Sequence, residues 1–511
     1  GGRLAIYHND GRGRFTLETN SVLTRPVARD QSGVIGIGTA LMVGASNYED
    51  GKTNGGCVRV YDLSRQVAGD SILGPTASTG PLAMADIDDD GDLDLFIGGR
   101  VVAGRYPEAA DSLLMRNEGG KMVLAQRLEK IGLVSGAVWS DLDGDGRAEL
   151  VLACEWGPIR VFALEGAKLI ERTEKFGFQQ QTGWWNGITT GDFDGDGRMD
   201  IVASNWGLNS PYRASGEHPC KIYYGDLSGS ESVDIIESSF DGKMAAEVPV
   251  RGLRAMMMAL PMMGERFGSF EAYGKANIHD VLGEGEKQLK VVEARTLATT
   301  IFLNRNGHFE AAQLPAEAQW APAFGICVAD FDGDGNDDIY LAQNFFPVHP
   351  ESSRLDAGRG LCLKGDGKGG FTAWSGQESG IKVYGEQRGC AVADYDGDGR
   401  IDLVTTQNGA ATRLFHNVKG RPGLRVRFAN YNASVGVVMR LVFGEERGPA
   451  REVHCGSGYW SQDGAVEVMA TPRPATKIWI RWPRGKETTN DIPASAKEIL
   501  VEASGTVKQV R

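Results

Sequence analysis

Short apolar runs alternate with glycine-rich acidic turns along most of this chain. One such turn, Asp330 to Asp338, follows the run at residues 326–329 and precedes a second apolar run at residues 339–341. Two short apolar runs joined by a polar turn form the pattern of a β-hairpin. Because this pattern occurs five times, the sequence predicts an all-β repeat protein.

The five turns share the pattern D-x-D-x-D-G-x-x-[DE], in which acidic residues recur at alternate positions. Positions 1, 3, 5, 7 and 9 are occupied by Asp86, Asp88, Asp90, Asp92 and Asp94 in the first turn, by Asp141, Asp143, Asp145, Arg147 and Glu149 in the second, by Asp192, Asp194, Asp196, Arg198 and Asp200 in the third, by Asp330, Asp332, Asp334, Asn336 and Asp338 in the fourth, and by Asp394, Asp396, Asp398, Arg400 and Asp402 in the fifth.

The spacing of the turns predicts a β-propeller. Their first aspartates stand 55, 51, 138 and 64 residues apart, and one four-stranded blade takes roughly 40–50 residues. The long interval must hold a further blade, an insertion or both, and it contains a weakened copy of the turn that begins at Asp226. With a hairpin at residues 34–47 that has no acidic turn, the count is about seven blades, and six or eight remain possible. We expect the N-terminal strands, near residues 4–7, to pair with the last blade.

The residue types in each turn predict calcium binding, at about five sites. Carboxylates at positions 1, 3, 5 and 9 and a backbone carbonyl at position 7 would form the hard oxygen cage that calcium prefers, and glycine at position 6 allows a left-handed backbone. An EF-hand would need a glutamate at position 12, where these turns have Ile97, Leu152, Ala203, Leu341 and Thr405. In the Asp226 copy serines replace two acids, so we expect an ordinary solvated turn there.

Two regions depart from the repeat, an insertion within the propeller and the C-terminal part of the chain. The sequence therefore predicts a propeller at residues 1–417 and a small β domain at residues 418–511. Within the propeller, residues of about 243–298 predict a helical insertion: Leu253, Met256 and Leu260 recur at helical spacing, and Ser269 would cap a second helix that ends near Gly283. We expect these helices to pack on the propeller. In the C-terminal domain, alternation places Ile478, Ile480 and Trp482 on one face of a strand.

Composition narrows the possible partners. The 70 glycines among 511 residues agree with many tight turns, and the net charge of −13 without a basic stripe argues against a nucleic-acid partner. Five bound dications would leave a net charge of about −3, so much of the acidity belongs to the turns.

No apolar run reaches the ~18 residues of a transmembrane helix. The seven cysteines show no zinc spacing and are expected to be small buried hydrophobes, although Cys362 and Cys390 could form a bridge.

The repeats and the C-terminal region together resemble a known family. Residues 451–462 contain Gly456-Ser457-Gly458-Tyr459-Trp460-Ser461-Gln462, and Trp482-Pro483-Arg484-Gly485 forms a second short motif. With the acidic turns, these elements resemble the integrin α-like FG-GAP/VCBS repeat propellers of the cartilage acidic protein (ASPIC/UnbV) family. The resemblance implies an exported, calcium-stabilised binding protein with no established reaction.

The sequence identifies no catalytic constellation, so we expect a protein that is not an enzyme. The leading hypothesis is an exported protein, extracellular, on the cell surface or periplasmic, that binds an extracellular protein or a glycan, as in adhesion. One alternative is a calcium-stabilised propeller enzyme, such as a polysaccharide lyase or hydrolase, that recruits His218, His279, His349 or Tyr273. A structural scaffold is another. A deep pocket that gathers histidine, tyrosine and arginine would favour the enzyme.

Overall fold

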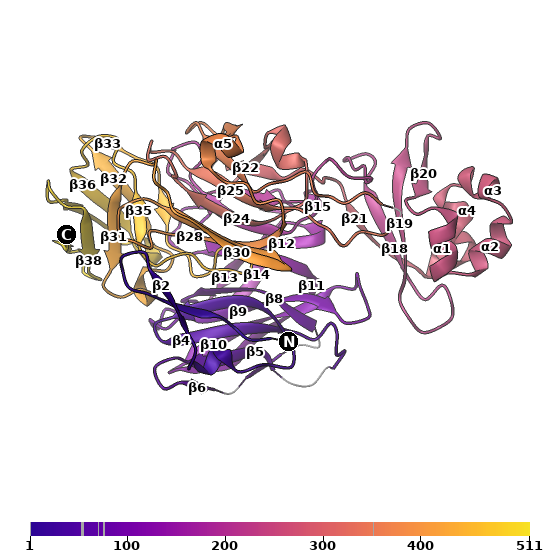
Figure 1. The fold of residues 1–511 in the computed structure, drawn as a ribbon, viewed down its shortest axis with the longest axis horizontal. Helices are drawn as coiled ribbons and strands as arrows, with labels where there is room; N and C mark the ends of the chain where they lie inside the picture. Colours follow the sequence, from indigo (N-terminus) through magenta and orange to yellow (C-terminus); the bar gives the residue numbers. More distant parts are fainter. Residues whose placement is uncertain (1, 53–55, 70, 75–76, 351) are drawn as a thin grey trace.

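The computed structural model describes residues 2–52, 56–69, 71–74, 77–350 and 352–511, and its sheets confirm the predicted all-β class (Figure 1). Residue 1 and the other residues left out of these ranges carry none of the predicted metal ligands. The α-helices of the described residues are short. They are α1 (Leu253–Ala259), α2 (Met262–Phe267), α3 (Phe270–Gly274), α4 (Ile278–Leu282) and α5 (Gly376–Ser379).

Six antiparallel sheets make up the body of the molecule among the described residues, and two of them share the long strand β11 (Lys121–Ser140), which joins them into one eight-stranded sheet. Their strands, in chain order, are β3 (Asp30–Ile37), β4 (Ala40–Ser46), β5 (Gly56–Asp62), β6 (Val67–Ala68) and β7 (Ile72–Leu73); β8 (Ala77–Ala85), β9 (Asp94–Val102), β10 (Ala110–Glu118) and the first part of β11 (Lys121–Ser140); the second part of β11 with β12 (Glu149–Pro158), β13 (Arg160–Glu165), β14 (Lys168–Glu171) and β15 (Thr182–Trp184); β16 (Gly187–Gly191), β17 (Asp200–Ser204), β22 (Thr300–Asn304) and β23 (Phe309–Gln313); β24 (Ala323–Ala329), β25 (Asp338–Gln343), β26 (Leu361–Gly365) and β27 (Phe371–Ala373); and β28 (Glu386–Ala393), β29 (Asp402–Asn408) and β30 (Ala410–Phe415).

The first strands of these sheets contact one another in the order β3, β8, β11, β16, β24 and β28. Apolar side chains fill the space between neighbouring sheets; Phe96 and Leu114 of one sheet, for example, share a cluster with Trp139 and Leu152 of the next. The arrangement is β-propeller-like, and we call these six sheets together the ring; no sheet in the described part of the chain closes on itself. The number of blades therefore stays a prediction.

The expected pairing of the N-terminal strands with the last sheet is wrong. Strand β1 (Ile6–Asn9) pairs with β2 (Phe15–Glu18) in a separate two-stranded sheet. These strands contact instead the fifth acidic turn, between β28 and β29: the Asn9 Nδ2 donates to the Tyr395 carbonyl oxygen at 2.6 Å, and the rings of Phe15 and Tyr395 lie 5.3 Å apart.

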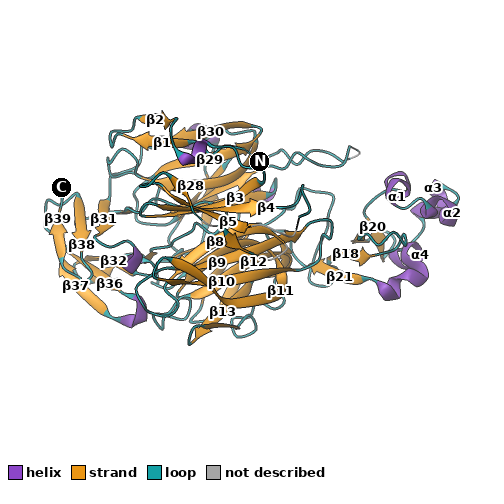
Figure 2. Cartoon of the chain, turned by 90° about the horizontal axis from the view of Figure 1, so that it is seen from below, coloured by secondary structure: helices purple, strands orange, loops and turns teal. Residues whose placement is uncertain are grey.

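The long interval between the third and fourth acidic turns holds an extra sheet as well as helices. Strands β18 (Cys220–Gly225), β19 (Asp234–Asp241), β20 (Ala246–Pro249) and β21 (Lys290–Ala294) form this sheet in the order β20-β19-β18-β21. It is inserted between β17 and β22, which are neighbours in one sheet of the ring. In Figure 1 the extra sheet and α1–α4 project at the right-hand end, and Figure 2 shows the same helices gathered away from the C-terminus.

Two expectations about the helices need correction. They pack on the inserted sheet and not on the ring, since Met256 and Met263 share a cluster with Tyr223 of β18 and Ile236 of β19. The second predicted helix is also two helices. Ser269 caps α3 as expected, accepting from the Ala272 amide, but Asn277 forms a second N-terminal cap that starts α4, because an asparagine side chain competes with a continuing helix for the backbone amides.

The C-terminal region forms two sheets at the opposite end of the ring (Figure 1). Their strands are β35 (Glu467–Met469), β31 (Leu424–Phe428), β38 (Glu498–Val501) and β39 (Val507–Gln509) in one sheet, and β33 (Glu446–Arg447), β32 (Val438–Phe443), β34 (Arg451–Glu452), β36 (Lys477–Arg481) and β37 (Glu487–Asp491) in the other. The alternation predicted for β36 is confirmed: Ile478, Ile480 and Trp482 share one core, whereas Trp479 joins a cluster of the ring.

Residues 455–464, which we call the central segment, connect the C-terminal sheets to the middle of the ring. The carbonyl oxygens of Cys455, Gly458 and Trp460 accept from amides of β8, β16 and β3 at 3.0–3.3 Å, and the Gly464 amide donates to β28 at 2.8 Å. The remaining two first strands, β11 and β24, are contacted by close packing. Gly458 lies against β11, and Tyr459 lies against Phe324 of β24. The central segment therefore touches all six first strands and occupies the centre of the ring.

All seven cysteines are unpaired and buried, in agreement with the expectation that they are small core residues. The bridge that the sequence left open between Cys362 and Cys390 is not formed. Within the described ranges, no helix has the length and apolar character needed to cross a bilayer.

The packing of the central segment predicts a specific sensitivity at Gly458. This residue has φ = +84°, and a Cβ there would lie 1.6 Å from the Ile188 carbonyl oxygen. Gly458→Ala should therefore destabilise the protein by roughly 3 kcal/mol or more, through backbone strain and overlap together. Gly444→Ala is the matched control, because Gly444 has φ = +71° with open space around it and should cost only about 1 kcal/mol. Equal losses in urea unfolding would contradict the packing described.

Candidate metal centres

The five acidic turns lie at one end of the ring. Each joins the first strand of a sheet to the second: β8 to β9, β11 to β12, β16 to β17, β24 to β25 and β28 to β29. Since the first strands contact one another around the ring, the turns gather at the end covered by the C-terminal sheets. The structure does not merge the turns into one site; each keeps its own set of acids.

Three hydrogen bonds recur in every turn and fold it into the same shape. The aspartate at position 1 accepts the amide of position 6, the acid at position 5 accepts the amide of position 7, and the acid at position 9 accepts the amide of position 2. The donor amides are Gly91, Asp92 and Ile87; Gly146, Arg147 and Leu142; Gly197, Arg198 and Phe193; Gly335, Asn336 and Phe331; and Gly399, Arg400 and Tyr395, at 2.7–3.2 Å.

Left-handed backbone at two positions makes this shape possible. In the third turn Gly195 and Gly197, at positions 4 and 6, have φ of +74° and +91°. Glycine adopts such angles without the steric cost that a Cβ imposes. The first turn has Asp89 at position 4, which still adopts φ = +68°, so position 6 is where all five turns have glycine.

Acidic oxygens converge in each turn. Groups whose ligand atoms all lie within 4.8 Å of one another include positions 1, 3 and 5 of the first turn, positions 1, 3 and 9 of the next three, and positions 3 and 5 of the fifth. The members are Asp86, Asp88 and Asp90; Asp141, Asp143 and Glu149; Asp192, Asp194 and Asp200; Asp330, Asp332 and Asp338; and Asp396 and Asp398 with His416. These clusters could hold a metal ion.

The hydrogen-bond inventory of the turns fits a hard cation. Asp88 Oδ1, Asp192 Oδ1 and Asp194 Oδ1 are buried and have no hydrogen-bond partner. A buried carboxylate oxygen without a partner costs free energy unless a donor or cation reaches it. Because the converging donors are almost entirely carboxylate oxygens, the residues present suit Ca²⁺, Mg²⁺ or Mn²⁺ better than a thiolate-seeking metal.

Burial shapes the electrostatics of the acids. Removal from water, reinforced by the neighbouring acids, raises the pKa of Asp338 and of Asp200 to about 8 and that of Glu149 to about 9. The same cause raises the pKa of Asp192 to about 7 and that of Asp94 to about 6. In the protein without a cation, these carboxylates are therefore costly to ionise.

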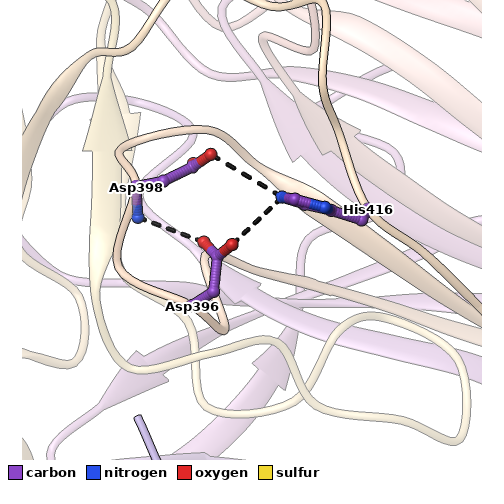
Figure 3. Close-up of side chains that lie close together, drawn as sticks. All are labelled: Asp396, Asp398 and His416. Carbon is purple, nitrogen blue, oxygen red and sulfur yellow. Dashed lines mark hydrogen bonds and ion pairs between the residues drawn. The ribbon is translucent and has the colours of Figure 1, made fainter. Parts of the chain in front are cut away.

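The structure adds a residue that the sequence interpretation missed. His416, at the end of the third strand of the last sheet, directs its imidazole at the fifth turn (Figure 3). Its Nε2 lies 3.0 Å from Asp396 Oδ2 and 3.7 Å from Asp398 Oδ2. The sequence signal was the strand end Phe415-His416-Asn417, but nothing in this motif placed the imidazole of His416 beside an acidic turn.

Basic side chains of the C-terminal sheets also reach the turns, and sequence reasoning missed them. Arg481 lies 2.7 Å from Asp141, Arg484 lies 2.6 Å from Asp89, and Arg451 lies 2.6 Å from Asp337. Arg425 pairs with Asp394, and the Ala450 amide donates to Asp192 Oδ2 at 2.7 Å. The C-terminal sheets are thus held on the acidic end of the ring by charge.

The Asp226 copy keeps the shape of the turn with different chemistry. It joins β18 to β19, Asp226 accepts the Glu231 amide at position 6, and Asp234 accepts the Leu227 amide. Glu231 takes φ = +62° where the other turns have glycine. Serine hydroxyls at positions 3 and 5 bond each other at 2.8 Å, so two carboxylates of the acidic turns are missing.

The residues considered for catalysis are not brought together. His218 stacks on Phe240, His279 pairs with Glu286, and Tyr273 donates to the Arg251 carbonyl oxygen. His349 instead lines a cavity of about 330 Å³ between the ring and the insertion, with Tyr106, Trp184, Trp206, Tyr212, Glu237, Arg251 and Phe345 among its other walls. We call it the ring–insertion cavity.

Comparison with known proteins supports the repeat type. Residues 141–203, which hold the second and third acidic turns, match the model of the FG-GAP-like repeat family. No curated protein matches the chain.

Three solved structures illustrate how distant the structural likenesses are. A protein from Lactobacillus plantarum is 11% identical, with a TM-score of 0.37, over 80% of this chain and 89% of that one. An exo-β-1,3-galactanase from Clostridium thermocellum is 8% identical, with a TM-score of 0.32, over 94% and 92%. Sqt1 of Saccharomyces cerevisiae is 9% identical, with a TM-score of 0.31, over 96% and 100%.

The raised pKa values predict how stability depends on pH in the absence of a dication. The pKa of Asp338 is about 8 in the folded protein and near 3.8 in the unfolded chain, so the folded state binds more protons between these values. The free energy of unfolding should therefore fall as pH rises from about 4 to about 8. Melting curves in chelator from pH 5 to 9 should show this decline.

Asp338→Asn should flatten this dependence, because the amide does not titrate. Glu284→Gln is the control, since its side chain is 98% exposed and should leave the slope as it is in the wild type. A melting temperature that rises with pH in chelator would show that these carboxylates are solvated.

Proposed function

We propose that this chain is an exported, calcium-stabilised FG-GAP/VCBS repeat propeller of about seven blades that binds an extracellular protein or glycan without transforming it. The observation that carries the proposal is the set of five acidic turns, each with the same hydrogen bonds and converging carboxylates, at one end of the ring. On this proposal residues 1–417 are the propeller, with the insertion at about 243–298, and residues 418–511 are an ASPIC/UnbV-like domain.

Calcium is the cation that suits these turns best. Each turn offers carboxylates at positions 1, 3, 5 and 9 and a backbone carbonyl at position 7, a ligand number and a looseness of geometry that magnesium tolerates poorly. In the third turn, Asp192, Asp194, Asp196 and Asp200 would hold the ion by their side chains and Arg198 by its carbonyl. A bound dication supplies positive charge, and the protein's own part is to hold several ionised carboxylates close together.

Export follows from the same chemistry. Extracellular calcium modules operate at calcium concentrations of roughly 10⁻⁴–10⁻³ M, which exist outside the cytosol. The buried, unpartnered oxygens of Asp88, Asp192 and Asp194 would be costly in a compartment where calcium is scarce.

The ring–insertion cavity supports binding over catalysis. It gathers the histidine, tyrosine and arginine that an enzyme would need, but two of these groups are already committed. Tyr212 donates to Glu237 at 2.6 Å, and burial together with that carboxylate raises the pKa of the phenol well above its usual value. Arg251 donates to the same carboxylate at 2.7 Å. The tyrosine is therefore a poor base, and the guanidinium is already neutralised.

Calcium should act on stability. An ion that binds only the folded state stabilises it by RT ln(1 + [Ca]/Kd), about 2.7 kcal/mol per site at a hundredfold excess. Millimolar calcium should raise the melting temperature by many degrees relative to chelator, and magnesium at the same concentration should do much less. Differential scanning calorimetry in the three conditions provides the measurement, and identical curves in chelator and calcium would refute the proposal.

Variants of single turns should divide this shift into parts. Asp196→Ala and Asp334→Ala should each remove one site and only part of the calcium-dependent gain, because the turns belong to separate sheets. Asp226→Ala, in the copy whose serines replace carboxylates, is the matched control and should leave the whole gain in place. A full loss from either single variant would mean that the sites are not independent.

The lyase or hydrolase alternative is the second candidate, and the cavity that gathers His349, Tyr212 and Arg251 is the observation in its favour. Incubation of the calcium-loaded protein with uronate and neutral polysaccharides should yield neither new reducing ends nor the ultraviolet absorbance of unsaturated uronates. Product formation that Glu237→Gln abolishes would replace the binding proposal with an enzymatic one.

A further inference from the structure

The ring–insertion cavity is assembled from parts of the chain that are far apart in sequence. Tyr106 comes from the connection between β9 and β10, Trp184 from β15, and Trp206 from the residues after β17. Phe345 follows β25, and Arg251 precedes α1 in the insertion. Strands β17 and β25 each begin at an acidic turn, so Trp206 and Phe345, which follow the ends of these strands, lie at the opposite end of the ring from the turns.

One wall of the cavity consists of aromatic rings that hold one another in place. The indoles of Trp184 and Trp206 stack with 3.8 Å between centroids and 5° between planes. Tyr212 meets Trp184 edge-on at 5.4 Å, and Phe345 lies 4.9 Å from Trp206. Because each ring is fixed by its neighbours, a ligand would not have to pay the entropy of ordering this wall.

Glu237 and Arg251 also line the cavity and form a polar pair without net charge. Glu237 accepts from Tyr212 Oη and Arg251 Nε at 2.6 and 2.7 Å, and its side chain is 12% exposed. The Arg251 side chain is 33% exposed, so part of the guanidinium still faces outward. A charged ligand would leave one charge without a counterpart, whereas hydroxyl groups could both donate to the carboxylate and accept from the guanidinium.

An unpartnered donor also belongs to this cavity. Trp206 is 6% exposed and its Nε1 is buried without a hydrogen-bond partner. A desolvated N–H of this kind costs roughly 1–3 kcal/mol when it stays unpaired. A ligand oxygen that reached this nitrogen would satisfy it.

We propose that the ring–insertion cavity binds one end of a neutral oligosaccharide; the proposal rests on the binding function proposed above and names its site and ligand class. A sugar ring presents an apolar C–H surface beside a rim of hydroxyl groups, which matches a cavity lined by aromatic rings and a neutral Glu237–Arg251 pair. The cavity volume of about 330 Å³ lies within the range of small-ligand pockets. An extended peptide, which is recognised along a strand edge or an open groove, matches it less well.

The test uses the full chain with calcium and five neutral probes: cellohexaose, laminarihexaose, xylohexaose, mannohexaose and chitohexaose. Isothermal titration calorimetry should detect binding of at least one of them. Trp206→Phe, which keeps an aromatic ring but removes the N–H, and Glu237→Gln, which removes the carboxylate charge, should each weaken that binding by tenfold or more. Should Trp206→Phe fail to fold, Glu237→Gln carries the same test, with calcium-dependent melting as the measure of folding.

The matched control is Trp320→Ala. Trp320 is 43% exposed and lies outside the cavity, although its carbonyl accepts from Asn209 near Trp206, so its loss should leave the affinity unchanged. Failure of all five probes to bind would overturn the proposal, as would binding that both cavity variants retain. Capture of a protein or peptide ligand by the calcium-loaded chain, with no sugar bound, would also overturn it and leave the wider binding function intact. Absence of any calcium effect on melting would instead contradict the proposed function itself.

Discussion

Like charges concentrated at one end of the ring are the constraint on which much of this structure depends. Each acidic turn folds by using its own carboxylates as acceptors for its own amides, and this brings several negative groups within a few ångströms of one another. The fold offsets the cost with neighbouring side chains, such as the Lys364 ammonium beside Asp334 and the His416 imidazole beside Asp396, and with arginines of the C-terminal sheets. The C-terminal region is therefore part of the electrostatic balance of the ring.

The two ends of the ring differ in character as a result. The turn end is acidic, covered by the C-terminal sheets and joined to them by Arg481, Arg451 and Arg425. The opposite end carries the aromatic residues and the insertion, whose helices pack on their own sheet. The proposed metal sites and the proposed ligand site can thus be altered separately, because they are attached to opposite ends of the same strands.

The sequence predicted those features that depend on neighbouring residues. The hairpins around the acidic turns, the cap at Ser269 and the alternation through Ile478 and Ile480 are local patterns, and the structure has all of them. The sequence could not predict features that depend on residues far apart in the chain. The approach of His416 to the fifth turn, the packing of Met256 on the inserted sheet and the stacking of Trp184 on Trp206 each join segments whose proximity follows only from the arrangement of whole sheets. The break between α3 and α4 was missed for another reason, since Asn277 competes locally with helix continuation.

The central segment has a consequence for how the protein is made. Gln462 exchanges hydrogen bonds with Gly36, a residue 426 positions earlier in the chain, and its neighbours contact the first strand of every other sheet. Contacts between such distant residues are slow to form because a long loop must close first. During synthesis, sheets can therefore appear one after another at the ribosome, but the axis that joins them stays unfilled until residues 455–464 emerge. A nascent chain that stalls before this point would leave the inward-facing edges of the six sheets without the segment that covers them.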